Sequence, residues 1–123
     1  MRPVHALRLL VVLLLLAGVA GCGSNNKGKL EGTRWTSDPG KVRGQSIPEG
    51  FMKLEFQVNG DLTLRGGGRT FTGTYSLGPG DLVTLYLDKE LAGSKVYIER
   101  MSVTGNRMTM SDPDGTELAF QKR

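Results

Sequence analysis

Apolar and polar residues alternate along most of the second half of the chain, and this pattern limits the fold more than any other feature. A period of two residues places apolar side chains on one face of a strand and polar side chains on the other. A β-rich stretch at 96–103 and a short segment at 33–36 add two further strands. The alternating inward-facing residues are Leu54, Phe56 and Val58; Leu62 and Leu64; Phe71, Gly73, Tyr75 and Leu77; Val83, Leu85 and Leu87; Met108 and Met110; and Leu118 and Phe120.

Turn sequences separate these predicted strands, and such short links make neighbouring strands antiparallel. We therefore predict an all-β fold of about eight strands, an antiparallel up-and-down meander. Closing the meander into a small barrel hides its edges, and a strongly curved open sheet is the alternative. The turns are Asn59-Gly60-Asp61, Gly66-Gly67-Gly68, Gly78-Pro79-Gly80-Asp81, Gly105-Asn106 and Asp112-Pro113-Asp114-Gly115.

Two segments depart from the alternation. The connection from Ser37 to Gly50 contains two prolines and three glycines, a composition that predicts no regular element over most of its length. It either crosses one end of the barrel or forms a lid over the barrel mouth. Residues 89–92 have a composition that allows one helical turn.

The first 21 residues have the order of an export signal. Arg2 and Arg8 flank the start, an apolar run extends from Leu9 to Leu16, and small residues occupy 17–21. The 13 residues from 9 to 21 rise about 1.5 Å each as a helix, which is too short for a hydrocarbon core of about 30 Å. We predict an N-terminal signal helix over residues 1–21 that is removed; an uncleaved anchor is one alternative.

Val19, Ala20, Gly21 and Cys22 resemble the lipobox of bacterial lipoproteins. The resemblance implies that a diacylglyceryl group is transferred to the Cys22 thiol, that a peptidase cuts before Cys22, and that acyl chains such as palmitate anchor the protein in a membrane. Cys22 is the only cysteine, so it has no partner for an intramolecular disulfide. The alternative is ordinary cleavage near Ala20, which leaves Cys22 as a free thiol.

Removal of residues 1–21, which include two arginines, leaves 102 residues with 14 basic and 12 acidic side chains. This length fits one domain with a modest core. We expect the acylated cysteine and a flexible tether at 22–30, because 23–29 has no apolar residue, followed by a β domain at 31–123. The small net charge lacks the clustered basic face that nucleic-acid binding requires.

Leu30, Gly32 and Trp35, followed by alternating strands and a last strand at 118–120, resemble the start and barrel of the lipocalin-like superfamily. That resemblance implies a lipocalin-like barrel with the tryptophan closing one end. The chain also looks similar to a paralogous set of small exported planctomycete proteins, which implies no activity. The matching segments are Lys29-Leu30-Glu31-Gly32-Thr33, Gly44-Gln45-Ser46-Ile47-Pro48, Leu54-Glu55-Phe56, Phe71-Thr72-Gly73, Tyr75-Ser76-Leu77 and Leu91-Ala92-Gly93-Ser94-Lys95.

The side chains of most hydrolases and zinc sites are missing from the predicted mature chain. The only histidine is His5, in the signal, and the only cysteine is Cys22, which excludes Ser-His-Asp, Cys-His and the usual zinc ligand sets. We predict no cofactor and no metal. An enzyme that uses only Asp, Glu, Lys or Tyr is the remaining catalytic alternative.

Three polar motifs have simpler structural interpretations. Glu55 and Glu99 are expected to face solvent rather than form a carboxylate pair. Asp112, Asp114 and Glu117 lack the EF-hand spacing, so a hairpin turn accounts for them. Residues 66–69 precede a strand rather than the helix of a phosphate loop, so they form a hairpin tip.

Aromatic residues in the inward phase are expected in the core, namely Trp35, Phe56, Phe71, Tyr75 and Phe120; Phe51, Tyr86 and Tyr97 are undecided.

These observations favour a non-enzymatic lipoprotein of the cell envelope, anchored in a membrane through Cys22, whose lipocalin-like barrel presents a binding surface or small pocket. The candidate partners are a small apolar ligand and an exported protein. A tethered inhibitor or adaptor that docks an exported protein through loops such as Ser37 to Gly50 is the alternative. The residue after Cys22 is Gly23 rather than Asp, which by the lipoprotein sorting rule favours the outer membrane over the inner one.

Overall fold

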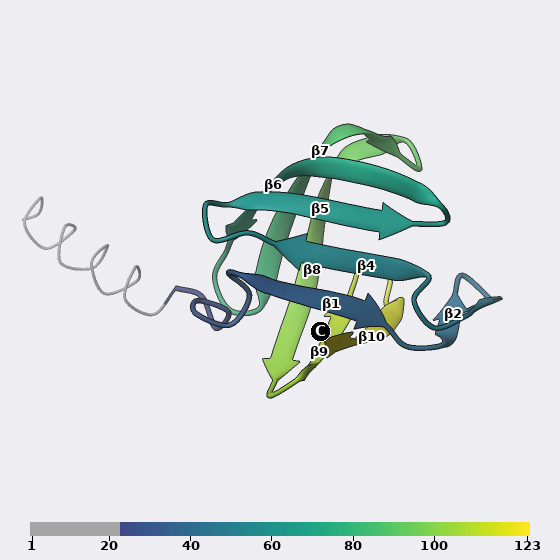
Figure 1. The fold of residues 1–123 in the computed structure, drawn as a ribbon, viewed down its shortest axis with the longest axis horizontal. Coiled ribbons are helices and arrows are strands. Elements are labelled where there is room, and N and C mark those ends of the chain that lie inside the picture. The colour runs from purple at the N-terminus through teal and green to yellow at the C-terminus, as the bar shows by residue number, and fades with distance from the viewer. Residues whose placement is uncertain (1–22) are drawn as a thin grey trace, which may run out of the picture.

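The computed structural model describes residues 23–123, so the predicted signal helix, the lipobox and Cys22 lie outside the described residues. Eight strands form a closed antiparallel barrel in the order β1-β4-β5-β6-β7-β8-β9-β10 (Figure 1). The predicted all-β barrel is confirmed, and the open sheet is excluded. The barrel strands are β1 (Thr33–Ser37), β4 (Met52–Phe56), β5 (Asp61–Gly66), β6 (Arg69–Leu77), β7 (Leu82–Leu91), β8 (Ser94–Thr104), β9 (Arg107–Ser111) and β10 (Glu117–Lys122).

The first strand closes the barrel because it pairs with two neighbours. Trp35 lies opposite Leu54 of β4 on one side and opposite Lys122 of β10 on the other. Every pairing in the barrel is antiparallel, and consecutive strands from β4 to β10 are neighbours. No strand of the barrel therefore presents an unpaired edge.

The inward phase of the strands fills the barrel with a single hydrophobic core. Phe56 and Tyr75 meet edge to face with ring centroids 5.0 Å apart, and the Tyr75 hydroxyl donates a hydrogen bond of 2.6 Å to the Gln57 carbonyl. Each fully buried large apolar side chain contributes about 1.5–3 kcal/mol, and residues 23–123 contain this whole core, which is what an independently folding domain requires. The predicted core aromatics are all buried, namely Trp35, Phe56, Phe71, Tyr75 and Phe120.

The segment before β1 closes one end of the barrel, where a flexible tether was predicted. Leu30 is fully buried, and the Asn26 side-chain amide donates to the Met101 carbonyl at 3.1 Å. The Gly80 amide donates to the Gly23 carbonyl at 2.8 Å, and the Asn25 amide donates to the Gly80 carbonyl at 2.9 Å. The tether prediction was wrong because buried polar side chains can fix a segment that has few apolar residues.

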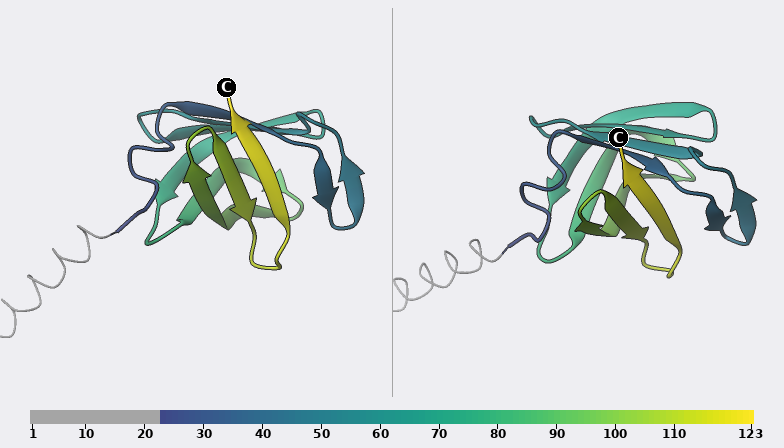
Figure 2. Two further views of the ribbon diagram at one scale, coloured as in Figure 1. Left: turned by 90° about the horizontal axis from the view of Figure 1, so that it is seen from below. Right: turned by 60° about the horizontal axis from the view of Figure 1, so that its bottom comes forward.

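The connection from Ser37 to Gly50 contains a regular element that its composition did not predict. Strands β2 (Gly40–Val42) and β3 (Gln45–Ile47) form a two-stranded hairpin, which stands beside one end of the barrel (Figure 2). Its two-residue turn places Arg43 and Gly44 at φ of 51° and 81°, the geometry of a type I′ hairpin. A non-glycine residue in the left-handed region is uncommon, so the turn was not recognised.

Two smaller predictions were also wrong. Val58 was assigned to the inward phase, but β4 ends at Phe56 and Val58 is 79% exposed in the β4–β5 turn. Residues 89–91 continue β7, and Ala92 and Gly93 form the β7–β8 turn with positive φ angles. The tips formed by Gly67-Gly68, Gly105-Asn106 and residues 112–116 agree with the predicted turns.

Candidate ligand pocket at the barrel mouth

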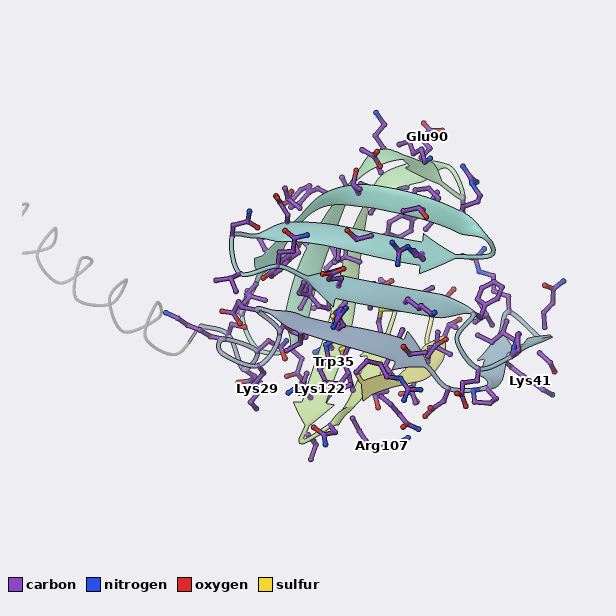
Figure 3. All side chains as sticks on the ribbon, viewed as in Figure 1. Lys29, Trp35, Lys41, Glu90, Arg107 and Lys122 are labelled. Atoms are coloured by element: carbon purple, nitrogen blue, oxygen red, sulfur yellow. The ribbon has the colours of Figure 1, made fainter. Side chains whose placement is uncertain are left out.

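The two ends of the barrel differ in how they are covered. Segment 23–32 covers one end, which we call the closed end. The β2–β3 hairpin and the turns β5–β6, β7–β8 and β9–β10 surround the other end, which we call the mouth. Lys29 at the closed end and Lys41 on the hairpin lie far apart on opposite sides of the molecule (Figure 3). The mouth is therefore the end at which a ligand can enter.

A cavity of about 290 Å³ opens at the mouth. Its walls are mostly the inward-facing apolar side chains of five strands, with Val42 of the hairpin and Ala92 of the β7–β8 turn at its rim. Small-molecule sites are typically concave and apolar with a few polar groups that fix the ligand, and this cavity has that character. The apolar side chains of the strands that line the cavity include Met52, Leu64, Leu85, Leu91, Met110 and Leu118.

Two carboxyl groups line this apolar cavity, Glu99 and Asp112, and Glu99 is the buried one. Glu99 of β8 is 8% exposed, and its Oε2 atom has no hydrogen-bond partner within the described residues. Glu99 lies directly opposite the buried Val83 in the β7–β8 ladder, so it belongs to the inward phase. The prediction that Glu99 faces solvent was wrong, whereas Glu55 is only half-buried, on the outer face of β4 beside Arg34.

The phase of β8 is ambiguous in the sequence because both of its faces carry apolar residues. Val96 and Ile98 point outward and are 48% and 52% exposed, whereas Tyr97 and Met101 point inward. A bulge between β7 and β8 beyond Tyr86 removes the register that a simple hairpin would give. The inward phase of the better-defined β7, with Val83 buried, is the signal that identifies Glu99.

Further acids lie near Glu99 at the mouth. Burial, followed by the charges of Asp112 and Asp114, raises the pKa of Glu99 from 4.5 to about 7. Burial also raises the pKa of Asp112, whereas a hydrogen bond from Asp112 and others from Thr116 lower the pKa of Asp114 to about 2. The pocket therefore combines apolar walls with a negative potential on one side.

The β9–β10 turn holds the two aspartates in place. The Thr116 amide donates to Asp112 Oδ1 at 3.2 Å and to Asp114 Oδ1 at 2.9 Å, and the Gly115 amide donates to the Asp112 carbonyl at 2.9 Å. This is the hairpin turn that the sequence predicted in place of a calcium loop. Residues 23–123 contain no group of three or more acidic, histidine or cysteine side chains that could hold a metal ion.

The remaining predicted motifs have structural roles. Gly66 ends β5, and Gly67 and Gly68 form the tip between β5 and β6. Arg69 and Lys89 lie over the Phe71 ring at 5.0 and 5.3 Å from its centroid. Of the undecided aromatics, Phe51 and Tyr86 are exposed, whereas Tyr97 packs against the core at the pocket.

Comparisons with protein-family models, with curated proteins and with solved structures give no match for this chain. Within residues 23–123, no helix is long and apolar enough to cross a membrane.

The burial of Glu99 predicts a pH-dependent stability. An acid whose pKa is higher in the folded state stabilises the fold fully below its unfolded pKa, and this contribution is lost as the pH rises through the folded value. For Glu99 the window extends from pH 4.5 to about 7. Across it we expect the free energy of unfolding to fall by about 2 kcal/mol, after allowance for solvent screening at the mouth.

Urea unfolding of residues 23–123 at pH 4.5 and pH 8 measures this loss, and Glu99→Gln is expected to remove most of it. Asp114 does not interfere, since its lowered pKa puts its own stabilising contribution above pH 4 and its loss below that window. The pKa of Asp112 is also raised, so Asp112 loses stability in the same direction as Glu99 and accounts for the loss that remains in Glu99→Gln. Equal pH profiles of the wild type and Glu99→Gln would show that Glu99 is not buried in the folded barrel.

Proposed function

We propose that this protein is a non-enzymatic, lipid-anchored lipoprotein of the cell envelope whose barrel mouth binds a small apolar ligand. The apolar cavity at the mouth carries the proposal for binding. The lipobox-like sequence ending at Cys22 carries the proposal for anchoring. The cavity volume is near the lower end of the range for small-molecule sites, so the expected ligand is small.

The position of Gly23 indicates how an anchored barrel would be oriented relative to the membrane. Gly23 is hydrogen-bonded to Gly80 at the closed end, and Gly23 is covalently bonded to Cys22. An acylated Cys22 would therefore hold the closed end next to the bilayer, without the tether that the sequence predicted. The mouth then faces away from the lipid surface, and its ligand enters from the aqueous side. By the lipoprotein sorting rule, a residue other than Asp directly after Cys22 favours the outer membrane over the inner one, and this residue is Gly23.

Binding of n-octanol tests the pocket, because octanol supplies an alkyl chain and no charge. We expect saturable binding to residues 23–123 by isothermal titration calorimetry. Met110→Trp is expected to weaken this binding at least tenfold, since Met110 lines the cavity and indole fills space that the ligand needs.

Thr109→Trp is the matched control. Thr109 is the neighbouring residue on β9, on the outer phase of the barrel wall, so this variant should bind octanol within twofold of the wild type. Circular dichroism and urea unfolding establish that both variants fold. No saturable binding to the wild type, or equal binding to both tryptophan variants, would refute the pocket proposal.

The adaptor hypothesis is the second candidate, and the β2–β3 hairpin favours it. The hairpin stands beside the mouth (Figure 2) and exposes Lys41 and residues 43–46, while Ile47 fixes its base in the core. A rigid scaffold that presents an exposed loop suits protein docking. Octanol binding distinguishes the two functions, because docking through the hairpin does not require an accessible cavity.

A further inference from the structure

We infer that the mouth pocket selects amphiphiles with a protonated amine head group, which pairs with the Glu99 carboxylate while the alkyl chain lies against the apolar walls. This inference rests on the proposed function, since it names the ligand class of the same pocket. It depends on the position of an unpartnered buried carboxyl, on the charges around it and on the size of the cavity.

The unpartnered oxygen of Glu99 indicates that the pocket binds a group that donates a hydrogen bond or carries a positive charge. A buried polar atom without a partner costs about 1–3 kcal/mol, and more when it is charged, so native structures retain such atoms only for a reason. Oε2 of Glu99 is such an atom, and the Glu99 side chain lines the cavity. A ligand that donates a hydrogen bond or brings a positive charge to this atom removes the cost. The free barrel therefore lacks an interaction that a bound cation supplies.

The surrounding charges decide which head group fits. Asp112 and Asp114 of the β9–β10 turn add negative charge beside Glu99. Arg43 of the β2–β3 turn also lines the cavity, and its positive charge lowers the pKa of the exposed Asp114, so that carboxylate balances part of the arginine charge. Tyr97, on β8 itself, donates its hydroxyl to the Leu91 carbonyl. A ligand carboxylate would meet like charges here, whereas an ammonium group has three donors and the opposite charge.

The cavity volume limits the apolar part of the ligand. About 290 Å³ equals the space of about ten water molecules at about 30 Å³ each. A chain of about eight carbons fits this space, with Leu64, Leu85 and Leu118 as its surroundings. Each buried methylene contributes about 0.8 kcal/mol. The apolar walls thus supply affinity, and Glu99 supplies selectivity.

The same geometry makes the selectivity pH-dependent. The Glu99 carboxyl has a pKa of about 7 in the free barrel, and an alkylamine keeps its proton to about pH 10. Both charges are present between these values, so amine binding is strongest near pH 8. Below pH 7 the amine must displace the proton from Glu99, and its advantage over a neutral ligand decreases.

Three probes of equal chain length test this inference on residues 23–123: n-octylamine, n-octanol and n-octanoate, titrated by calorimetry at pH 8 and pH 5.5. We expect octylamine to bind at least tenfold more tightly than octanol at pH 8, and octanoate to bind most weakly. At pH 5.5 the ratio of octylamine to octanol affinity should fall below threefold.

Two variants assign the effect to Glu99. Glu99→Gln should reduce the octylamine to octanol ratio at pH 8 to about one, and Glu99→Asp, which keeps the charge, should retain part of it. Glu117→Gln removes an equal charge from an exposed position near the mouth, on β10, and should leave the ratio unchanged.

Each outcome separates this inference from the proposed function. Octanol and octylamine binding with equal affinity to the wild type would overturn the amine selectivity and leave the apolar pocket standing. An octylamine preference that persists in Glu99→Gln would overturn the role of Glu99. Absence of binding by all three probes would refute the proposed function as well.

Discussion

Replacement of Cys22 by serine is expected to abolish lipid attachment and to reduce the membrane-bound fraction of the protein at least tenfold. The thiolate is a far better nucleophile than a hydroxyl, so a serine of nearly the same size does not accept the diacylglyceryl group. Each acyl methylene contributes about 0.8 kcal/mol of membrane affinity, and stable anchoring requires at least two chains. Replacement of the Cys22 sulfur by oxygen therefore removes the whole lipid anchor.

Metabolic labelling of bacteria with an alkyne analogue of palmitate, followed by membrane fractionation, measures this effect. Intact-mass measurement of the wild type should show a chain that begins at an acylated Cys22. Gly21→Ala keeps a small residue before the cysteine and is the control that should still be labelled. A wild type without label, or a mature chain that begins before Cys22, would contradict the anchoring proposal.

Gly73→Ala is expected to destabilise the barrel by about 3 kcal/mol or more, the upper range for overpacking. Gly73 of β6 lies opposite Leu87 of β7. A Cβ atom at position 73 would lie 1.9 Å from the Tyr86 carbonyl oxygen and 2.9 Å from the Tyr86 carbonyl carbon. Both are backbone atoms in the barrel wall, so no side-chain movement relieves the clash.

Gly66→Ala is the matched control, because a Cβ atom there meets nothing closer than 3.9 Å. The control should change the free energy of unfolding by less than about 1 kcal/mol, since glycine to alanine in extended backbone without a clash is a small effect. Urea unfolding of both variants measures the difference. Similar stabilities of the two variants would show that β6 and β7 do not approach this closely.

The sequence predicted the barrel because its strongest signals are local. Alternation from Leu54 to Phe120 identifies the faces of the strands, and short turns make the strands antiparallel. The hairpin at 40–47 could not be predicted, because its turn depends on an arginine with positive φ. Segment 23–30 was misjudged for a different reason. Asn26 is buried through hydrogen bonds to residues 55 and 75 positions away, and no local pattern encodes such contacts.

The pocket shows the same division between local and long-range information. Its apolar walls follow from the alternation, since Leu64, Leu85 and Leu118 were all assigned to the inward phase. Glu99 was not, because Val96 and Ile98 give the opposite face of β8 an equally apolar sequence. The register against β7 decides the phase, and that register includes a bulge that only the three-dimensional structure reveals.

The proposed function requires that a ligand enters the apolar mouth of this barrel. Titration of isotopically labelled residues 23–123 with n-octanol, followed by nuclear magnetic resonance of side-chain methyl groups, tests it most directly. We expect saturable shifts at Met52, Leu64, Leu85, Met110 and Leu118, with Leu30 at the closed end unchanged. Shifts confined to the outer residues Val96 and Ile98, or to Leu30, would contradict it.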